Sequence, residues 1–199
     1  MLKFSGFTLV ELTIAMALST TLILFSTIGA ANIARDLTYF QQQLALHSEL
    51  RLLSHSIALQ LKRAGYVART FEEILADSTL LPPTITISEH PSEVNRSCIL
   101  FSYDKNANGE ISKKNPAELL GFRLRNDALE YRIATKNCDQ GGWHDLTDTK
   151  EIKVTAFSIT LHAKVNNAPV YKVHLALQSK ASSNLTAEQY ILVRVPNEI

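Results

Sequence analysis

The chain has 199 residues, a formal net charge of +1 and 20% charged side chains, which suits one ordinary domain with an appendage. The balanced charge argues against a general nucleic-acid-binding protein, which carries a basic excess. Seven glycines and six prolines exclude a collagen-like or low-complexity chain. Two cysteines are too few for a four-thiolate zinc site but sufficient for one disulfide bond.

The N-terminal segment is apolar and almost free of charge. Between Phe7 and Ala34 the only ionisable residue is Glu11, and residues 12–34 are 23 consecutive uncharged positions. As a helix rising about 1.5 Å per residue they reach roughly 34 Å, enough to cross a hydrocarbon core of about 30 Å. Serine and threonine hydroxyls in this stretch can bond to helix carbonyls, so they do not forbid insertion. Lys3 precedes the segment, which predicts a cytoplasmic N-terminus and an exported remainder.

Three interpretations of this segment are open. A secretory signal would be removed after a small-residue site, for which Gly29-Ala30-Ala31 is a poor candidate. An uncleaved signal anchor would keep the segment in the membrane. The third interpretation explains details that the other two do not, namely Gly6 before the apolar stretch, Phe7 directly after this glycine, and the carboxylate of Glu11.

The run Gly6-Phe7-Thr8-Leu9-Val10-Glu11-Leu12 resembles the class III leader of type IV prepilins and type II secretion pseudopilins, usually written G-F-T-L-x-E. The resemblance implies that residues 1–6 are a leader peptide and that a prepilin peptidase cuts between Gly6 and Phe7 on the cytoplasmic side. It also implies that the same enzyme methylates the new amine of Phe7. The apolar helix is then retained, unlike a secretory signal.

Glu11 is the residue for which the resemblance implies a role in assembly. A carboxylate near the end of a membrane helix is costly and usually has a partner. Between staggered subunits of a filament, the Phe7 amine of one subunit can meet Glu11 of another. Such a pair in an apolar core would specify axial register. The alternative is an interfacial glutamate whose side chain reaches towards water.

A second apolar pattern predicts that the helix continues beyond the membrane. A stripe recurs mostly at three- and four-residue steps, and Gly65 is a suitable C-terminal stop. The stripe comprises Leu37, Phe40, Leu44, Leu50, Leu53, Ile57, Leu61 and Ala64. We therefore predict one helix over Phe7–Ala64. Residues 7–34 are the predicted transmembrane part of the N-terminal helix, and residues 35–66 are its predicted exported amphipathic half.

Residues 67–199 are predicted to form a β-rich globular domain with a short helix at Phe71–Ala76. Strands are predicted at Thr84–Ile87, Cys98–Tyr103, Leu119–Leu124, Leu129–Ala134, Ile152–Ala163, Val170–Gln178 and Tyr190–Val195. Turn candidates at 125–128 and 166–169 make short connections, which imply an antiparallel sheet. The predicted fold class is α+β, a pilin fold in which the long N-terminal helix, transmembrane and then amphipathic, packs on an antiparallel β-sheet.

Three further runs narrow the resemblance within the pilin superfamily. They are similar to the minor pilins called prepilin peptidase-dependent protein B and to the J-type minor pseudopilins. The runs are Lys62-Arg63-Ala64-Gly65-Tyr66, Tyr103-Asp104-Lys105-Asn106-Ala107-Asn108-Gly109 and Gly121-Phe122-Arg123-Leu124.

Cys98 and Cys138 both fall on the exported side of the predicted topology, where oxidising conditions favour disulfides. The enclosed loop spans 40 positions, and closing it would stabilise the fold by about 3–4 kcal/mol in the chain-entropy model. We predict a disulfide between them. Two buried thiols are the alternative, which geometry decides.

The run from Asp104 to Ile111 resembles the first half of a calcium loop, D-x-N-x-N-G-x-I. The candidate metal ligands are Asp104, Asn106, Asn108 and Glu110. The twelfth position is Asn115 where a calcium loop has a bidentate glutamate, and Glu118 is a candidate substitute. The alternative is a plain Asn-Gly turn that joins two strands.

The sequence contains no phosphate-binding loop, nucleophile elbow or metallohydrolase spacing, so we predict no catalytic residue and no enzyme. The resemblance implies a minor pilin or pseudopilin that primes or joins assembly of a type IV pilus or a type II secretion pseudopilus after prepilin peptidase processing. No cofactor is required, and Ca²⁺ is the single candidate ion. A pilus-tip binding module, either an adhesin or a DNA receptor, is the alternative function.

The implied partners are prepilin peptidase, other minor and major pilins or pseudopilins through the N-terminal helix, and the inner-membrane assembly platform. The implied location is the bacterial inner membrane, crossed once, with the C-terminal domain in the periplasm, and the assembled filament. Removing residues 1–6 takes away Lys3 alone among the charged residues, which leaves 19 basic and 19 acidic side chains. General nucleic-acid binding is therefore not expected.

Overall fold

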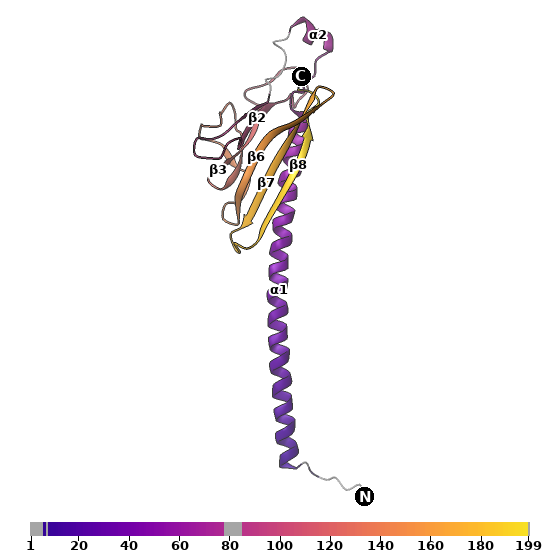
Figure 1. Ribbon diagram of the computed structural model, residues 1–199, viewed down its shortest axis with the longest axis vertical. Helices are drawn as coiled ribbons and strands as arrows, with labels where there is room; N and C mark the ends of the chain where they lie inside the picture. The colour runs from indigo at the N-terminus through magenta and orange to yellow at the C-terminus, as the bar shows by residue number, and fades with distance from the viewer. Residues whose placement is uncertain (1–5, 7, 78–84, 199) are drawn as a thin grey trace. The chain divides into compact units, whose positions relative to one another are not determined.

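The computed structural model describes residues 6, 8–77 and 85–198, without the side chain of Phe71. The chain divides into two compact units, Met1–Leu44 and Ala45–Ile199. A single long helix, α1 (Leu9–Arg63), begins in the first unit and ends in the second (Figure 1).

The helix α1 follows the predicted helix closely, although Phe7, the predicted first residue, lies outside the described residues. Glu11 in the first turn and Lys62 and Arg63 in the last complement the helix dipole. The chain leaves the helix at Gly65, whose φ of 80° is a conformation that glycine adopts without strain. A Cβ at this position would lie 2.5 Å from the carbonyl oxygen of Asn197, so the close approach of the two backbones also requires glycine.

The buried face of α1 lies in the second unit. Its buried residues recur at steps of three and four and are Leu46, Leu50, Leu53, Ser54, Ile57 and Leu61. The apolar stripe was predicted to begin earlier, but Leu37, Phe40 and Leu44 are each more than half exposed. The first unit contains no described element besides α1, so no part of it covers these three side chains.

The short helix α2 (Phe71–Ala76) forms where it was predicted. Thr70 is its N-cap, and its Oγ1 accepts a hydrogen bond from the Glu73 N–H at 3.3 Å. The Thr70 N–H in turn donates to Glu73 Oε2 at 2.9 Å. This reciprocal capping box satisfies two backbone donors that the first helical turn leaves free.

The strands form two antiparallel sheets. The five-stranded sheet has the order β1-β2-β3-β4-β5, and the three-stranded sheet has the order β6-β7-β8. The strands of the first sheet are β1 (Thr86–Ser88), β2 (Cys98–Ser102), β3 (Leu119–Arg125), β4 (Ala128–Tyr131) and β5 (His144–Asp145). Those of the second are β6 (Ile152–Val165), β7 (Ala168–Ser179) and β8 (Thr186–Arg194).

Two hairpin turns form where the sequence predicted them. Asn126 and Asp127, between β3 and β4, have φ values of 50° and 64°. Asn166 and Asn167, between β6 and β7, have the same pair of values. Positive φ at both central residues is the requirement of the type I′ turn, and asparagine and aspartate tolerate it best after glycine.

A bulge changes which residues of β6 face the core. Val154 pairs with Leu177 and Ala156 pairs with Ala176, so one extra residue of β6 lies between the two pairs. The extra residue shifts the alternation, as β-bulges do. Val154 before the extra residue and Phe157 after it are therefore both buried, although three positions separate them.

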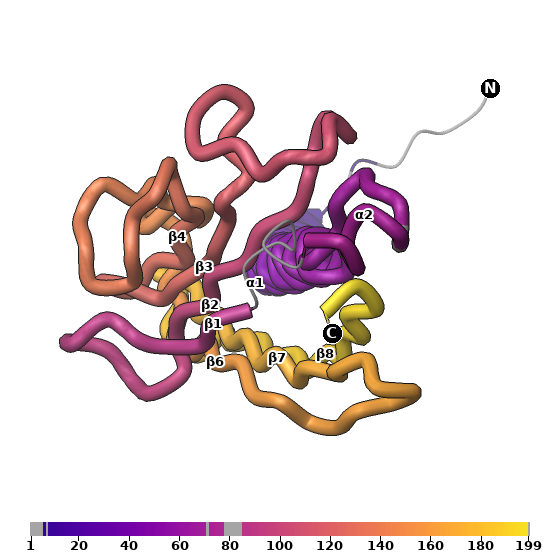
Figure 2. Tube along the Cα trace, turned by 90° about the horizontal axis from the view of Figure 1, so that it is seen from above, coloured from indigo at the N-terminus to yellow at the C-terminus, as the bar shows by residue number. Residues whose placement is uncertain are grey.

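One hydrophobic core joins the second-unit part of α1 to both sheets. Figure 2, viewed along α1, shows β1–β4 on one side of the helix and β6–β8 along another. The core includes Ile57 and Leu61 of α1, Ile99 of β2, Leu129 of β4, Leu175 and Leu177 of β7 and Val193 of β8. The predicted α+β class, a long N-terminal helix packed on antiparallel β-structure, is confirmed.

Candidate functional site

The N-terminal candidate site consists of Gly6, Phe7 and Glu11. Gly6 is exposed, whereas Phe7 and residues 1–5 lie outside the described residues. Of the two residues of the predicted cleavage junction, the structure therefore describes Gly6 alone. Glu11 lies exposed in the first turn of α1.

Glu11 and Thr8 form a capping box at the start of α1. Glu11 Oε2 accepts hydrogen bonds from the N–H and the Oγ1 of Thr8, each at 2.9 Å. Thr8 Oγ1 accepts one from the Glu11 N–H at 3.3 Å. The Thr-x-x-Glu spacing is the sequence signature of this motif, although we did not predict a cap at this position. The carboxylate therefore has donors within its own chain, and its pairing with a neighbouring subunit stays a prediction.

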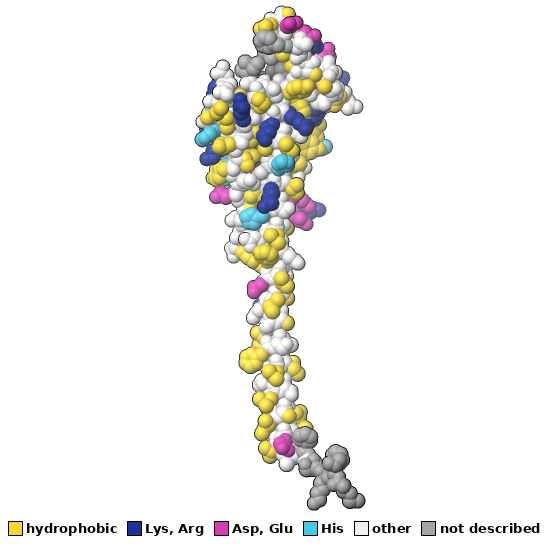
Figure 3. All heavy atoms as spheres, turned by 90° about the vertical axis from the view of Figure 1, so that its right-hand side faces the viewer, with side chains coloured by type: hydrophobic (Ala, Val, Ile, Leu, Met, Phe, Trp, Pro, Cys, Tyr) yellow, Lys and Arg dark blue, Asp and Glu magenta, His cyan; other side chains and the backbone are white. Residues whose placement is uncertain are grey.

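The apolar part of α1 is long and apolar enough to cross a membrane, and none of its most apolar stretch is buried within the chain. In Figure 3 hydrophobic side chains cover much of its visible surface. Five of its hydroxyl groups bond back to carbonyls three or four residues earlier, as predicted. The pairs are Thr13 with Val10, Ser19 with Ala15, Thr20 with Ala17, Thr21 with Leu18 and Thr27 with Leu24. Water is therefore not needed to satisfy these hydroxyl groups.

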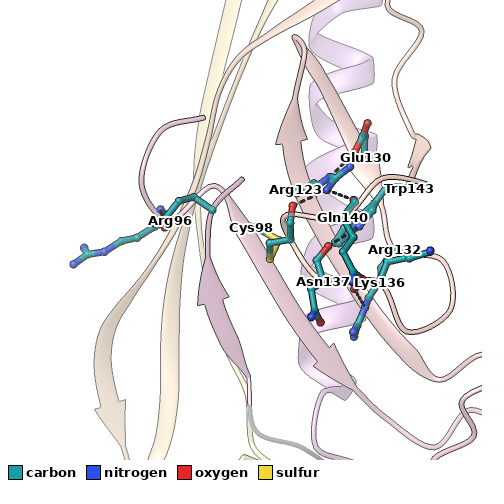
Figure 4. Close-up of a disulfide and its surroundings, with 11 residues drawn as sticks. Arg96, Cys98, Arg123, Glu130, Arg132, Lys136, Asn137, Gln140 and Trp143 are labelled. Atoms are coloured by element: carbon teal, nitrogen blue, oxygen red, sulfur yellow. Dashed lines mark hydrogen bonds and ion pairs between the residues drawn. A yellow bond between two sulfur atoms is a disulfide. The ribbon is translucent and has the colours of Figure 1, made fainter. Parts of the chain in front are cut away.

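The predicted disulfide between Cys98 and Cys138 is present (Figure 4). It joins the first residue of β2 to the segment between β4 and β5. Both cysteines are buried in a small cluster with Trp143, the only tryptophan of the chain, and Leu100 packs against the cluster.

A buried ion pair, which we did not predict from the sequence, lies beside this disulfide. Arg123 of β3 is 1% exposed and pairs with Glu130 of β4 through its Nε. One of its terminal nitrogens donates to the carbonyl oxygens of Cys138 at 2.6 Å and Gln140 at 2.8 Å. Its guanidinium carbon lies 4.5 Å from the centre of the Trp143 ring. The buried charge thus has an anionic partner, two carbonyl groups and an aromatic ring around it, and such partners make the burial of an arginine tolerable.

Comparison with known proteins identifies the family. A model of the family described as "Prepilin peptidase-dependent protein B" matches residues 40–195. The chain belongs to this family. It is 28% identical over 183 residues to the Escherichia coli (strain K12) protein of that name, with 90% of this chain and 89% of that protein covered.

A second relative is an uncharacterized protein of Haemophilus influenzae, 27% identical over 154 residues, with 56% of this chain and 64% of that protein covered. No solved structure matches this member of the prepilin peptidase-dependent protein B family. The family match from residue 40 includes both cysteines but not Gly6 to Glu11. The leader motif therefore supports the pilin resemblance independently of that match.

The candidate calcium loop of this family member lies between β2 and β3, within residues 103–118. It is longer than the tight Asn-Gly turn that was the alternative. Asp104 is almost inaccessible to solvent and accepts three backbone hydrogen bonds, from Ala68 at 3.1 Å, Asn108 at 3.2 Å and Gly109 at 2.7 Å. Burial by itself raises the pKa of Asp104, but these N–H groups and that of Ala107 together lower the pKa below its ordinary value.

The other candidate ligands also serve the loop itself. Asn106 Oδ1 accepts from the Asn108 N–H at 3.2 Å, and Asn108 Oδ1 accepts from the Glu110 N–H at 2.9 Å. The fully buried Glu118 accepts from the N–H groups of Lys105 at 2.7 Å and Ser112 at 2.8 Å. Across residues 8–77 and 85–198 no group of three or more His, Cys, Asp or Glu side chains is arranged to hold a metal ion. Calcium binding by this loop stays a prediction.

The solvent face of the β6–β8 sheet carries an aromatic and charged cluster. The rings of His174 and Tyr190 stack with centroids 4.2 Å apart. Lys172 Nζ lies 4.6 Å from the centre of the Tyr190 ring, and His174 Nε2 lies 3.4 Å from Glu188 Oε2. Tyr190 and its neighbour in the same strand face, Leu192, are 54% and 59% exposed.

Proposed function

We propose that the chain is a minor pilin or pseudopilin, a structural subunit that primes or joins assembly of a type IV pilus or a type II secretion pseudopilus. The observation that carries the proposal is its membership of the prepilin peptidase-dependent protein B family together with an N-terminal helix whose apolar surface is unburied. An apolar helix without an internal partner needs either lipid or other helices around it. A subunit that assembles into a filament from the membrane is surrounded first by lipid and then by the helices of other subunits. The proposed role is structural, without a catalytic activity of its own.

Processing by prepilin peptidase is the first step of the proposed function. The class III motif supports cleavage between Gly6 and Phe7, and N-methylation of the Phe7 amine would follow. Gly6 is exposed, which suits a segment that a peptidase must reach. The family name implies dependence on this peptidase.

The proposed topology places the N-terminus in the cytoplasm and the second unit in the periplasm. Lys3 before the apolar segment supports this orientation. The Cys98–Cys138 disulfide supports it as well, because disulfides form and persist in oxidising compartments such as the periplasm.

Glu11 is the proposed assembly residue, and the proposed partners are other pilins or pseudopilins and the inner-membrane platform. Thr8 partners the Glu11 carboxylate within its own chain. In an assembled filament the methylated amine of a neighbouring Phe7 would add a cation to this site. A neighbouring cation is favoured there because a carboxylate inside a bundle of membrane helices is costly without one.

Analysis of the N-terminus of the protein from bacterial membranes tests the proposal. We expect a mature chain that begins with N-methylated phenylalanine at position 7 and retains α1. The Gly6→Asp variant should stay at its precursor mass. The Gly29→Ala variant should mature normally, because the added Cβ would meet no atom within 4 Å outside the adjacent helix backbone. A mature chain that begins beyond residue 31 would instead identify a cleaved secretory signal.

The exposed cluster of Lys172, His174 and Tyr190 favours the second candidate, a binding module carried at a pilus tip. We propose it as the secondary candidate because the Tyr190 ring already contacts His174 and Lys172 of the same sheet. These contacts leave 54% of Tyr190 exposed to a ligand. A Tyr190→Ala variant that assembles normally but loses adhesion or DNA uptake would favour this candidate over a purely structural role.

A further inference from the structure

A cleft opens between α1 and the five-stranded sheet, entirely within the second unit. Its volume is about 250 Å³. Ser56 and Gln60 of α1 line one side of it, and Phe101 and Phe122 of β2 and β3 contribute buried aromatic surface. The two rings lie 6.0 Å apart and are 3% and 6% exposed as residues. The cleft therefore offers a hydrophobic lining for an inserted side chain.

Two cations line the same cleft, Lys105 and Arg132, and none of its described lining residues carries a carboxylate. Lys105 Nζ donates to the carbonyl oxygen of Ala117 at 3.1 Å, which leaves two of its three donor protons free. Arg132 Nε donates to the carbonyl oxygen of Lys136 at 2.6 Å. Within the described part of the chain no residue accepts a hydrogen bond from the terminal nitrogens of Arg132.

Partial burial makes the charge of Arg132 costly. Burial lowers the pKa of the Arg132 guanidinium, although arginine stays protonated in proteins. The hydroxyl group of Tyr131, another lining residue, is held by His144 Nδ1 at 3.2 Å. An anion that entered the cleft would meet two cations with free donors beside a fixed hydroxyl group.

The size of the cleft limits what can occupy it. Sites for drug-sized molecules and cofactors measure about 300–1,000 Å³, so this cleft is small for them. It suits one or two side chains of a peptide, which an apolar lining and two donors to a carboxylate would recognise together.

We propose that this cleft is a docking site for an acidic segment of a partner protein, which inserts an apolar side chain against Phe101 and Phe122 and presents a carboxylate to Lys105 and Arg132. Docking here is independent of the assembly role proposed above, because it uses the second unit and not Gly6, Phe7 or Glu11.

Fluorescence anisotropy with the full chain in detergent micelles tests the docking site. The probe is the fluorescein-labelled peptide Gly-Leu-Glu-Leu-Glu-Gly-amide, and the matched control peptide carries glutamine in place of both glutamates. We expect saturable binding of the acidic probe and at least tenfold weaker binding of the control. Arg132→Gln and Lys105→Gln should each raise the Kd of the acidic probe about tenfold, the effect of one charge-assisted hydrogen bond.

Lys164→Gln is the matched control variant, because Lys164 is an exposed cation of β6 outside the cleft. It should leave the Kd unchanged. Lys105 is exposed, so Lys105→Gln remains informative if circular dichroism shows that Arg132→Gln alters the fold. Equal binding of the two peptides, no binding of the acidic probe at millimolar concentration, or unchanged binding by both cleft variants would overturn the proposal. Displacement of the probe by equimolar sodium acetate would also overturn it, since the site would then recognise any small anion.

Discussion

At the start of α1, the Glu11 carboxylate has one observed role and one proposed role, and a single alanine substitution would not separate them. Glu11 accepts hydrogen bonds from Thr8 as part of the helix cap, and it is the proposed partner of a neighbouring amine. A cap of this kind is worth about 0.5–2 kcal/mol to a helix. The negative charge of Glu11 matters chiefly for the proposed pairing, in which a neighbouring cation approaches it in an apolar environment.

Glu11→Gln and Thr8→Ala together distinguish the two roles. The glutamine side chain still accepts a hydrogen bond from the Thr8 N–H but carries no charge, so this variant should insert in the membrane and be processed. We expect its incorporation into filaments, measured by immunoblotting of sheared filaments, to fall at least tenfold. Thr8→Ala weakens the cap and keeps the charge, so it should retain most incorporation. Equal defects in the two variants would assign the effect to capping instead.

Asp104 should make the stability of the second unit depend on pH. Backbone N–H groups lower the pKa of the folded Asp104 carboxyl below its ordinary value, which is about 3.9 in unfolded chains. Its contribution to stability is therefore complete above pH 4 and is lost as the pH falls through the lower folded pKa. Asp104→Asn should lower the free energy of unfolding by about 1–3 kcal/mol at pH 7 and flatten its slope below pH 4.

Denaturant titrations at a series of pH values measure this effect. Asp148→Asn is a suitable control, because Asp148 is exposed and its Oδ1 accepts one bond, from the Lys150 N–H at 2.8 Å. A variant with the wild-type acid slope would contradict the role given to Asp104. The same titrations with and without Ca²⁺ test the loop as an ion site, since a bound ion raises stability with its concentration.

At the scale of elements, the segment between β4 and β5 is held by two devices instead of by regular structure. The disulfide ties it to β2, and Arg123 of β3 donates to its carbonyl groups at Cys138 and Gln140. Arg123 also reaches Glu130 of β4 and the ring of Trp143. Gly121 belongs to the same arrangement, because a Cβ there would lie 2.6 Å from the Ile99 carbonyl oxygen and 3.2 Å from the Trp143 ring.

Replacing both Cys98 and Cys138 by serine should lower the free energy of unfolding by about 2–4 kcal/mol. Trp143 is 7% exposed and is the only tryptophan, so its fluorescence reports this segment directly. We expect a shift of its emission to longer wavelength in the double variant and in the reduced wild type. Wild-type stability and emission in the double variant would show that Arg123 alone holds the segment.

At the scale of the whole molecule, the two units differ in what surrounds their apolar residues. The buried residues of α1 all lie in the second unit, whereas Leu9, Phe25 and other large apolar residues of the first unit are exposed. The first unit thus contributes an unburied helix, and the second carries the hydrophobic core that joins helix and sheets.

A chain that begins at Ala45 should therefore fold and leave the membrane fraction. Removing residues 1–44 takes away no buried side chain of α1. With the Cys98–Cys138 disulfide formed in both proteins, the Tm of the shortened chain should therefore stay within about 2–4 °C of that of the full chain in detergent, the shift of about 1 kcal/mol. Cell fractionation and thermal melts followed by circular dichroism measure both effects. Ile57→Asp in the shortened chain, which places a charge in the core, is the control that should abolish the folded state.

Several features followed from the sequence, and all of them except the disulfide depend on neighbouring residues. The long helix follows from a run without proline and an apolar periodicity, and both hairpins follow from Asn-Asp and Asn-Asn pairs that tolerate positive φ. The disulfide follows from two cysteines in a chain that carries no others. The capping box at Thr8 was equally local, and its spacing was sufficient to predict it.

Only the tertiary structure decided the division into two sheets, the bulge that turns Phe157 inward, the burial of Arg123 against Glu130 and the cleft beside Arg132. Each depends on which distant segments pack together, and the alternation of a strand does not specify its partner or an extra residue within it. A buried charge is likewise invisible in sequence, because the partners that make its burial tolerable come from separate strands and loops.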